Sequence, residues 1–95
     1  MSDKIELTTV VQRKANIAFT DIDHEIMLLH PELGRFFSFN KIGSDIWNLI
    51  QNPMEVNELV KQLTNNYEVD AHTCFSDVSY FLTLLLEKKL IEIIA

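Results

Sequence analysis

The chain has little of what metal sites, disulfide frameworks and membrane spans are built from. Among its 95 residues there is one cysteine, Cys74, with two glycines and two prolines. A lone thiol excludes an intrachain disulfide and a cysteine-rich metal site. The longest apolar run, residues 81–86, falls far short of the roughly 20 residues of a membrane span, and residues 1–4 lead into no apolar signal segment. We therefore expect a cytoplasmic protein without a transmembrane segment.

Basic residues are also few. Eight Lys and Arg stand against fourteen Asp and Glu, and the formal net charge is −6. This charge repels phosphate backbones and anionic lipid heads, so it disfavours nucleic acid or a membrane as the main partner. A neutral or basic partner is favoured.

Catalytic and metal-binding patterns are weak. His24, His30 and His72 are scattered, and neither HExxH nor paired-cysteine spacing is present, so we expect no metal and no other cofactor. Cys74 lies near the start of a predicted helix, where the dipole can lower a thiol pKa, but His72 does not share its face. A non-catalytic protein is favoured, and a thiol enzyme with Cys74 as nucleophile is the weaker alternative.

Hydrophobic residues make up 47% of the chain, which excludes a disordered segment and predicts one small domain. Residues 5–11 are rich in β-branched side chains but run into Gln12, Arg13 and Lys14. We expect residues 1–15 to form an N-terminal arm or an extra strand. Residues 16–95 should form the folded domain.

Three strands are predicted in the first half of that domain. Residues 17–22 and 25–30 favour strands, and Asp23 and His24 supply turn chemistry between them. Pro31 and Gly34 then bracket a second turn, which leads into a strand over residues 35–39. The pattern indicates a three-stranded antiparallel sheet.

Three helices should follow. Apolar residues recur at helical spacing over residues 41–51, 55–66 and 71–88, with Asn40 and Asp70 as N-caps of the first and third. Residues 90–94 suit a short additional strand. The predicted fold class is therefore α+β, with a three-stranded antiparallel sheet followed by three helices.

The third helix is apolar over too much of its circumference. Its eight apolar positions cover an arc of about 200°, whereas a surface helix needs a stripe of about 100°. Five of them should face the core: Phe75, Val78, Leu82, Leu85 and Leu86. The others, Cys74, Phe81 and Leu84, would form a flank near Asp77 that could accept a guest. The alternatives are that the sheet, or a second copy in a homodimer, covers this flank.

The segment from Gly34 to Asn40 has the character of a binding edge. Aromatic residues alternate along its strand, and Asn40 caps the helix that follows. Such an edge is a candidate docking surface for an extended peptide, and ordinary strand-to-helix packing is the alternative.

Together these segments resemble the PqqD-like family over roughly residues 15–91. Members share a G-[RK]-aromatic-aromatic-x-[LF]-N-x-x-[GA] segment, an [IL]-W pair and an L-x-x-L-x-x-x-x-L-[IV] ending. The matching parts of this chain are Gly34–Asn40, Ile42-Gly43, Ile46-Trp47, Val56–Leu63, Tyr67, and the last helix running into Leu90-Ile91. Lys89 departs from the pattern, because relatives often have Gly there, and this puts the geometry after the third helix in question.

The resemblance implies a winged-helix-like RiPP recognition element, which binds the leader of a ribosomally made precursor peptide. The leader would add as a strand to the edge of the third strand, against the third helix, and be presented to a separate leader peptidase or modifying enzyme. Placement by analogy gives these leader-binding residues: Arg35, Phe36, Phe37, Ser38, Cys74, Asp77, Val78 and Phe81.

Stand-alone members of this length resemble the recognition subunit of lasso-peptide systems, which is the favoured assignment. The first alternative is a peptide chaperone of pyrroloquinoline quinone synthesis or of a radical enzyme. A winged-helix DNA-binding regulator is the alternative from another class, although the third helix lacks the basic side chains that DNA recognition needs.

Overall fold

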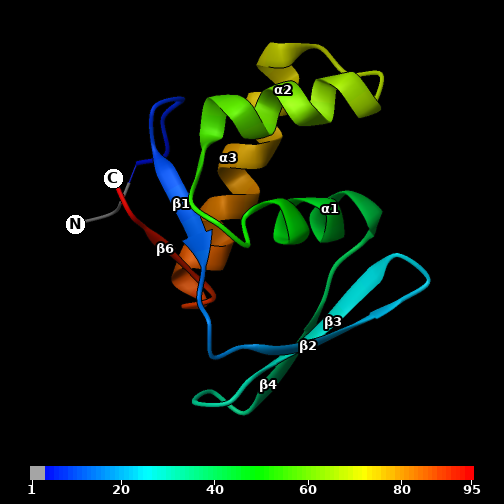
Figure 1. Ribbon diagram of the computed structural model, residues 1–95, viewed down its shortest axis with the longest axis vertical. Helices are drawn as coiled ribbons and strands as arrows, with labels where there is room; N and C mark the ends of the chain where they lie inside the picture. The colour runs from blue at the N-terminus through cyan, green and yellow to red at the C-terminus, as the bar shows by residue number, and fades with distance from the viewer. Residues whose placement is uncertain (1–3) are drawn as a thin grey trace.

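The computed structural model describes residues 4–95, and the part of the predicted N-terminal arm at residues 1–3 lies outside this range. Within the described residues the chain forms two small antiparallel sheets and three helices (Figure 1). In chain order the elements are β1 (Val10–Arg13), β2 (Ala18–Ile22), β3 (Glu25–His30), β4 (Arg35–Ser38), α1 (Lys41–Leu49), β5 (Met54–Glu55), α2 (Val56–Asn66), α3 (Ala71–Glu87) and β6 (Ile91–Ile93). The predicted α+β class is confirmed.

The sheet β2-β3-β4 is the predicted antiparallel one. Ile22 pairs with Glu25, so Asp23 and His24 make a two-residue turn, and both have positive φ, of 53° and 69°. Turns of this kind match the twist of the flanking strands. Gly34, with φ of 63°, closes the second turn. Local turn chemistry therefore sets the register of all three strands.

A second sheet has the order β5-β1-β6 and joins segments that are far apart in the sequence. Val11 pairs with Met54 on one side and with Ile93 on the other. Figure 1 shows β1 and β6 side by side, near the C-terminus of the chain. The strand at residues 91–93 was predicted, but β5 and this sheet were not.

The helices begin where the caps predict. The Asn40 side chain accepts a hydrogen bond from the Gly43 N–H at 2.9 Å, and the Asp70 side chain accepts one from the Thr73 N–H at 2.8 Å. All three helices end within two residues of the predicted positions. Among the described helices, none combines the length and the apolar composition needed to cross a bilayer.

One core joins the helices to both sheets. Trp47 of α1 is fully buried, and its ring meets Phe19 edge-on at 6.0 Å between centroids. The Ser44 hydroxyl of α1 also accepts the N–H of Ile26 in β3 at 2.7 Å. The sheet that ends in β4 is therefore fixed against α1.

The core face of α3 differs from the predicted one. Its buried residues are Cys74, Val78, Leu82 and Leu85. Cys74 was expected on the flank, whereas Phe75 and Leu86, expected at the centre of the core face, are only half-buried. The buried stripe is rotated because Cys74 lies beside Leu63 of α2 in one pocket, whereas Phe75 lies beside Ile5 of the N-terminal segment in another.

The chain leaves α3 through a tight left-handed turn. Lys89 has φ of 59°, its N–H donates to the Leu86 carbonyl, and the Leu90 N–H donates to the Leu85 carbonyl, both at 3.0 Å. This is the Schellman arrangement, in which glycine is usual at the left-handed position. The departure at Lys89 therefore leaves the turn itself intact.

Candidate functional site

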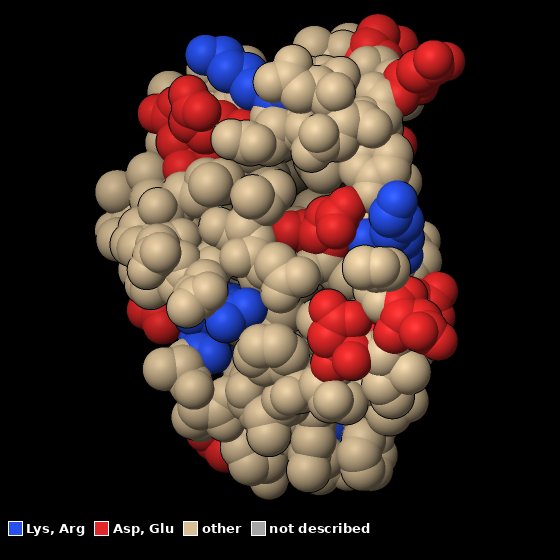
Figure 2. All heavy atoms as spheres, turned by 45° about the vertical axis from the view of Figure 1, so that its right-hand side comes forward, with Lys and Arg blue, Asp and Glu red and all other residues tan. Residues whose placement is uncertain are grey.

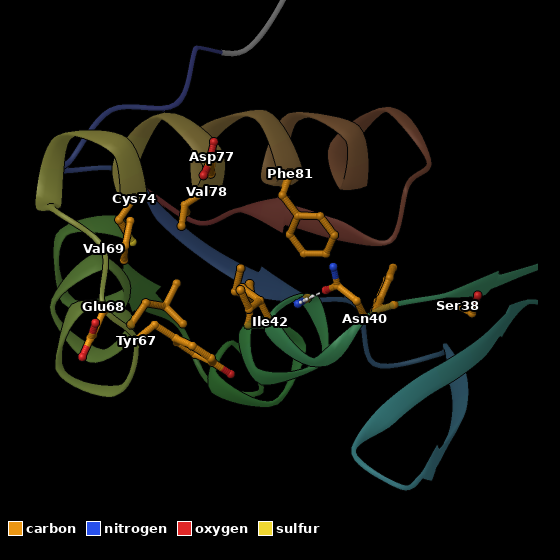
Figure 3. A pocket seen from close by; sticks show the side chains of 14 residues that line it. Ser38, Asn40, Ile42, Tyr67, Glu68, Val69, Cys74, Asp77, Val78 and Phe81 are labelled. Carbon is orange, nitrogen blue, oxygen red and sulfur yellow. Dashed lines mark hydrogen bonds between the residues drawn. The ribbon is translucent and has the colours of Figure 1, made fainter.

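A groove of about 630 Å³ lies between α3 and the chain that leads from β4 into α1 (Figure 3). Three segments contribute its walls: side chains between Ser38 and Ile46, the end of α2 with the loop that follows, and the side of α3 from Cys74 to Phe81. In Figure 3, Ser38 lies at one end and Glu68 and Val69 at the other, with Phe81 and Ile42 between them.

The walls of the groove are largely apolar. Val78, Cys74, Ile46 and Leu63 are buried residues of the core that also line it. The Phe81 ring meets Phe39 edge-on at 5.3 Å between centroids. A Cβ atom at Gly43 would come within 3.1 Å of the Phe81 ring, so glycine at this position lets the ring lie against α1. The groove therefore suits apolar side chains of a guest.

Carboxylates are the charged groups of the groove. Glu68 and Asp77 line it and are exposed, and Tyr67 donates a hydrogen bond to the nearby Asp45 carboxylate. That hydrogen bond is the main reason why the pKa of Tyr67 is raised. On the face shown in Figure 2, acidic side chains form several separate groups on a largely uncharged surface.

Cys74 lies in the wrong setting for a nucleophile. Burial, and then the negative charges of Asp77 and Asp70, raise the pKa of its thiol. Reactive cysteines need surroundings that lower this pKa. Within residues 4–95, moreover, no three His, Cys, Asp or Glu side chains come together in a way that could hold a metal ion. The surroundings of Cys74 therefore disfavour a thiolate nucleophile at this position.

Beside the groove, β4 is an edge strand, because within the described chain it pairs with β3 alone. The Phe39 N–H donates to the Ile26 carbonyl at 2.9 Å, and Ser38 stands opposite Met27. Hydrogen-bonded and non-hydrogen-bonded pairs alternate along an antiparallel ladder. The backbone N–H and C=O groups of Phe36 and Ser38 therefore point away from β3, toward the open edge.

The four predicted residues of the third helix, Cys74, Asp77, Val78 and Phe81, all line the groove. Of the four strand residues, Ser38 alone does so. Arg35 and Phe36 are exposed along β4, Phe36 with 73% of its surface, and Phe37 is half-buried against the core. The sequence predicted that a flank of the third helix and the edge of the third strand lie side by side. In the structure the groove runs along that flank and reaches the strand at Ser38.

Sequence reasoning missed the groove residues outside these two elements. Ile42 had been assigned to the helix stripe but is 44% exposed in the groove. Val69 and Glu68 lie in the loop between α2 and α3, where no pattern indicated a role. The sequence offered one indication of such a role, which is that Val69 is an apolar residue in a short, otherwise mainly polar connection.

The sequence model of the family described as Coenzyme PQQ synthesis protein D (PqqD) matches residues 25–91. Among solved structures, TbiB1 in complex with the TbiA(beta) leader peptide is similar, with a TM-score of 0.80 and 32% identity over 85% of this chain and 94% of that one. The comparison with curated proteins gives no match.

A second similar structure is the solution structure of the PqqD truncation of Methylobacterium extorquens PqqCD, described as a stand-alone RiPP recognition element. Its TM-score is 0.77, with 19% identity over 93% of this chain and 94% of that one. This second likeness supports the fold alone.

Proposed function

The chain belongs to the PqqD family, and from that premise we propose that it is a RiPP recognition element that binds the leader of a ribosomally synthesised precursor peptide. The leader adds as a strand to the open edge of β4 and lies in the groove beside α3. The protein then presents it to a separate leader peptidase or modifying enzyme.

One observation carries this proposal: an unpaired strand edge borders an apolar groove. Strand addition needs free backbone groups for affinity and pockets for alternate side chains for specificity. The outward backbone groups of Phe36 and Ser38 supply the first, and the groove between Ile42 and Phe81 supplies the second. TbiB1, which is similar over most of this chain, is described in complex with a leader peptide.

The eight residues predicted from the sequence remain the proposed leader contacts, and the structure suggests a different role for each group of them. Cys74, Val78 and Phe81 offer apolar wall, and Asp77 offers charge. Arg35, Phe36 and Ser38 flank the guest strand along β4, whereas Phe37 holds that strand to the core. Ile42 and Val69 join the set from the opposite wall and the far end.

We further propose a non-catalytic role in a lasso-peptide system. The raised pKa of the Cys74 thiol disfavours a cysteine nucleophile. TbiB1, which is 32% identical over 85% of this chain, is described in complex with a leader peptide, and this supports a recognition role. A role in quinone-cofactor or radical-enzyme pathways is the alternative that neighbouring genes would decide.

Direct titration tests the proposal. The leader segment of the precursor-like reading frame beside the gene is synthesised with a fluorescent label, and its polarisation is followed as the protein is added. We expect saturable binding with one leader per chain, competition by unlabelled leader, and no competition by a scrambled peptide. Equal competition by the scrambled peptide would contradict the proposal.

A DNA-binding role has no support from the third helix. From Ala71 to Glu87 it contains no Lys or Arg, and its side chains include His72 as the single basic type. A recognition helix meets phosphates and base edges with basic and amide side chains. Titration with a labelled DNA duplex at low salt should therefore give no change in polarisation.

A further inference from the structure

The charged side chains that line the groove are all acidic, a feature that strand addition by itself does not require. Glu68 and Asp77 both line it, whereas none of its lining residues is Lys or Arg. The salt bridge found among residues 4–95 joins Lys61 to Glu58, so neither groove carboxylate has an ion-pair partner there. Lys41 lies beside a lining residue, since its Nζ is over the ring of Tyr67, 5.7 Å from the ring centroid.

These carboxylates lie toward one end of the groove. Figure 3 places Ser38 at the β4 end, Phe81 and Ile42 in the middle, and Asp77 and Glu68 in the half formed by the start of α3 and the loop before it. A peptide that pairs with β4 and continues along the groove therefore crosses an apolar stretch before it reaches the two acidic side chains.

Resting on the proposed function, we propose that the bound leader carries a lysine or arginine at the end of the groove where Asp77 and Glu68 are exposed, beyond the segment that pairs with β4. Such a cation enters the negative potential of both carboxylates, beside apolar walls that reduce screening by water. An acidic leader residue at the same place would be repelled by both.

Two further observations support a cation at this end. Burial raises the pKa of the Cys74 thiol most, and the charges of Asp77 and Asp70 raise it further, so negative potential also acts on the groove wall. The chain as a whole has a net charge of −6, which attracts a basic segment over longer distances and speeds encounter.

The experiment uses a displayed library of random 15-residue peptides, because it requires no knowledge of the natural leader. The full chain serves as bait, as do the double variant Asp77→Asn/Glu68→Gln and the matched control Asp23→Asn/Glu87→Gln. The control removes the same two charges from exposed positions outside the groove. Selected peptides are then titrated with each protein at low and high salt.

We expect the parent and the control to select peptides in which Lys or Arg recurs at a fixed spacing from apolar residues. The groove variant should lose this preference and bind the same peptides about 3- to 10-fold more weakly, with a smaller loss at high salt. Replacing the recurrent Lys or Arg by Gln should weaken binding to the parent and leave binding to the groove variant unchanged.

Three results would overturn the inference. If peptides are selected without a basic preference and bind parent and groove variant equally, the cation subsite is wrong while leader binding stands. If the control variant loses as much affinity as the groove variant, general charge and not this site is responsible. If the parent selects no peptides at all, the proposed function fails and this inference fails with it.

Discussion

The imidazole Nε2 of His30 lies 3.1 Å from the carbonyl oxygen of Lys89, which ties the end of β3 to the turn that follows α3. The other ring nitrogen, Nδ1, accepts the N–H groups of Glu32 and Leu33 at 3.2 and 3.3 Å, so Nε2 carries the proton and donates it. His30 is buried. The sheet that offers the open edge and the helix that faces it are thereby joined by a side-chain hydrogen bond.

Replacing Lys89 by glycine should stabilise the protein. Lys89 holds φ of 59°, which costs a side chain about 1 kcal/mol and costs glycine almost nothing. We expect Lys89→Gly to raise the free energy of unfolding by about 0.5–1 kcal/mol and the melting temperature by a few degrees, as measured by circular dichroism. Lys88→Gly is the control, because Lys88 has φ of −85°, and it should give no gain.

Proline substitutions should separate the open edge of β4 from its paired edge. The Ser38 N–H points outward, so Ser38→Pro should leave the sheet intact. The substitution removes a backbone donor that would pair with the leader, and we expect binding to weaken about 5- to 10-fold. Phe37→Pro removes an N–H that faces β3 and should destabilise the fold. Far-UV circular dichroism and leader titration distinguish the two outcomes, and full affinity in a folded Ser38→Pro variant would argue for another docking mode.

A charge at Phe81 should weaken leader binding. Phe81→Asp places a carboxylate in the apolar part of the groove, and we expect a loss of more than about 10-fold in affinity with helix content retained. Tyr80→Asp is the matched control, since Tyr80 is 70% exposed on the neighbouring position and does not line the groove. Equal affinities of Phe81→Asp and the parent in the polarisation titration would refute the groove as the binding site.

The stability of the protein should fall at high pH in a way that depends on Cys74. Its pKa is raised in the folded chain, by burial first and by Asp77 and Asp70 next. The unfolded thiol therefore ionises first, and the contribution to stability that is present below about pH 8.5 is lost as the pH rises further. Urea unfolding between pH 7 and 10 should show a steeper decline for the parent than for Cys74→Ala. Tyr67, whose pKa is also raised, is common to both proteins.

Local chemistry predicted the elements whose ends depend on neighbouring residues. Asp23 and His24 specified their turn, and Asn40 and Asp70 specified their helix starts, because a cap or turn acts within about four residues. The β5 strand spans only Met54 and Glu55 and exists because Val11 lies beside it. A two-residue strand has no period, so its pairing could not be predicted from the sequence.

The same distinction applies to the groove. The helix residues from Cys74 to Phe81 could be nominated, since helical spacing places them on adjoining faces. Glu68 and Val69 reach the groove because the connection between α2 and α3 folds over its end, which is a consequence of how those two helices pack. Helical spacing placed Ile42 on the apolar face of the helix over residues 41–51. It could not reveal that other parts of the protein leave this side chain exposed.

Trp47 is the single tryptophan of the chain, and Phe39 stands between it and the groove. The Phe39 ring lies 5.9 Å from the Trp47 ring and 5.3 Å from that of Phe81, centroid to centroid. A guest that displaces Phe81 also shifts the surroundings of one buried indole. The emission of this single tryptophan should therefore change when the groove is occupied, which gives a readout of binding without any attached dye.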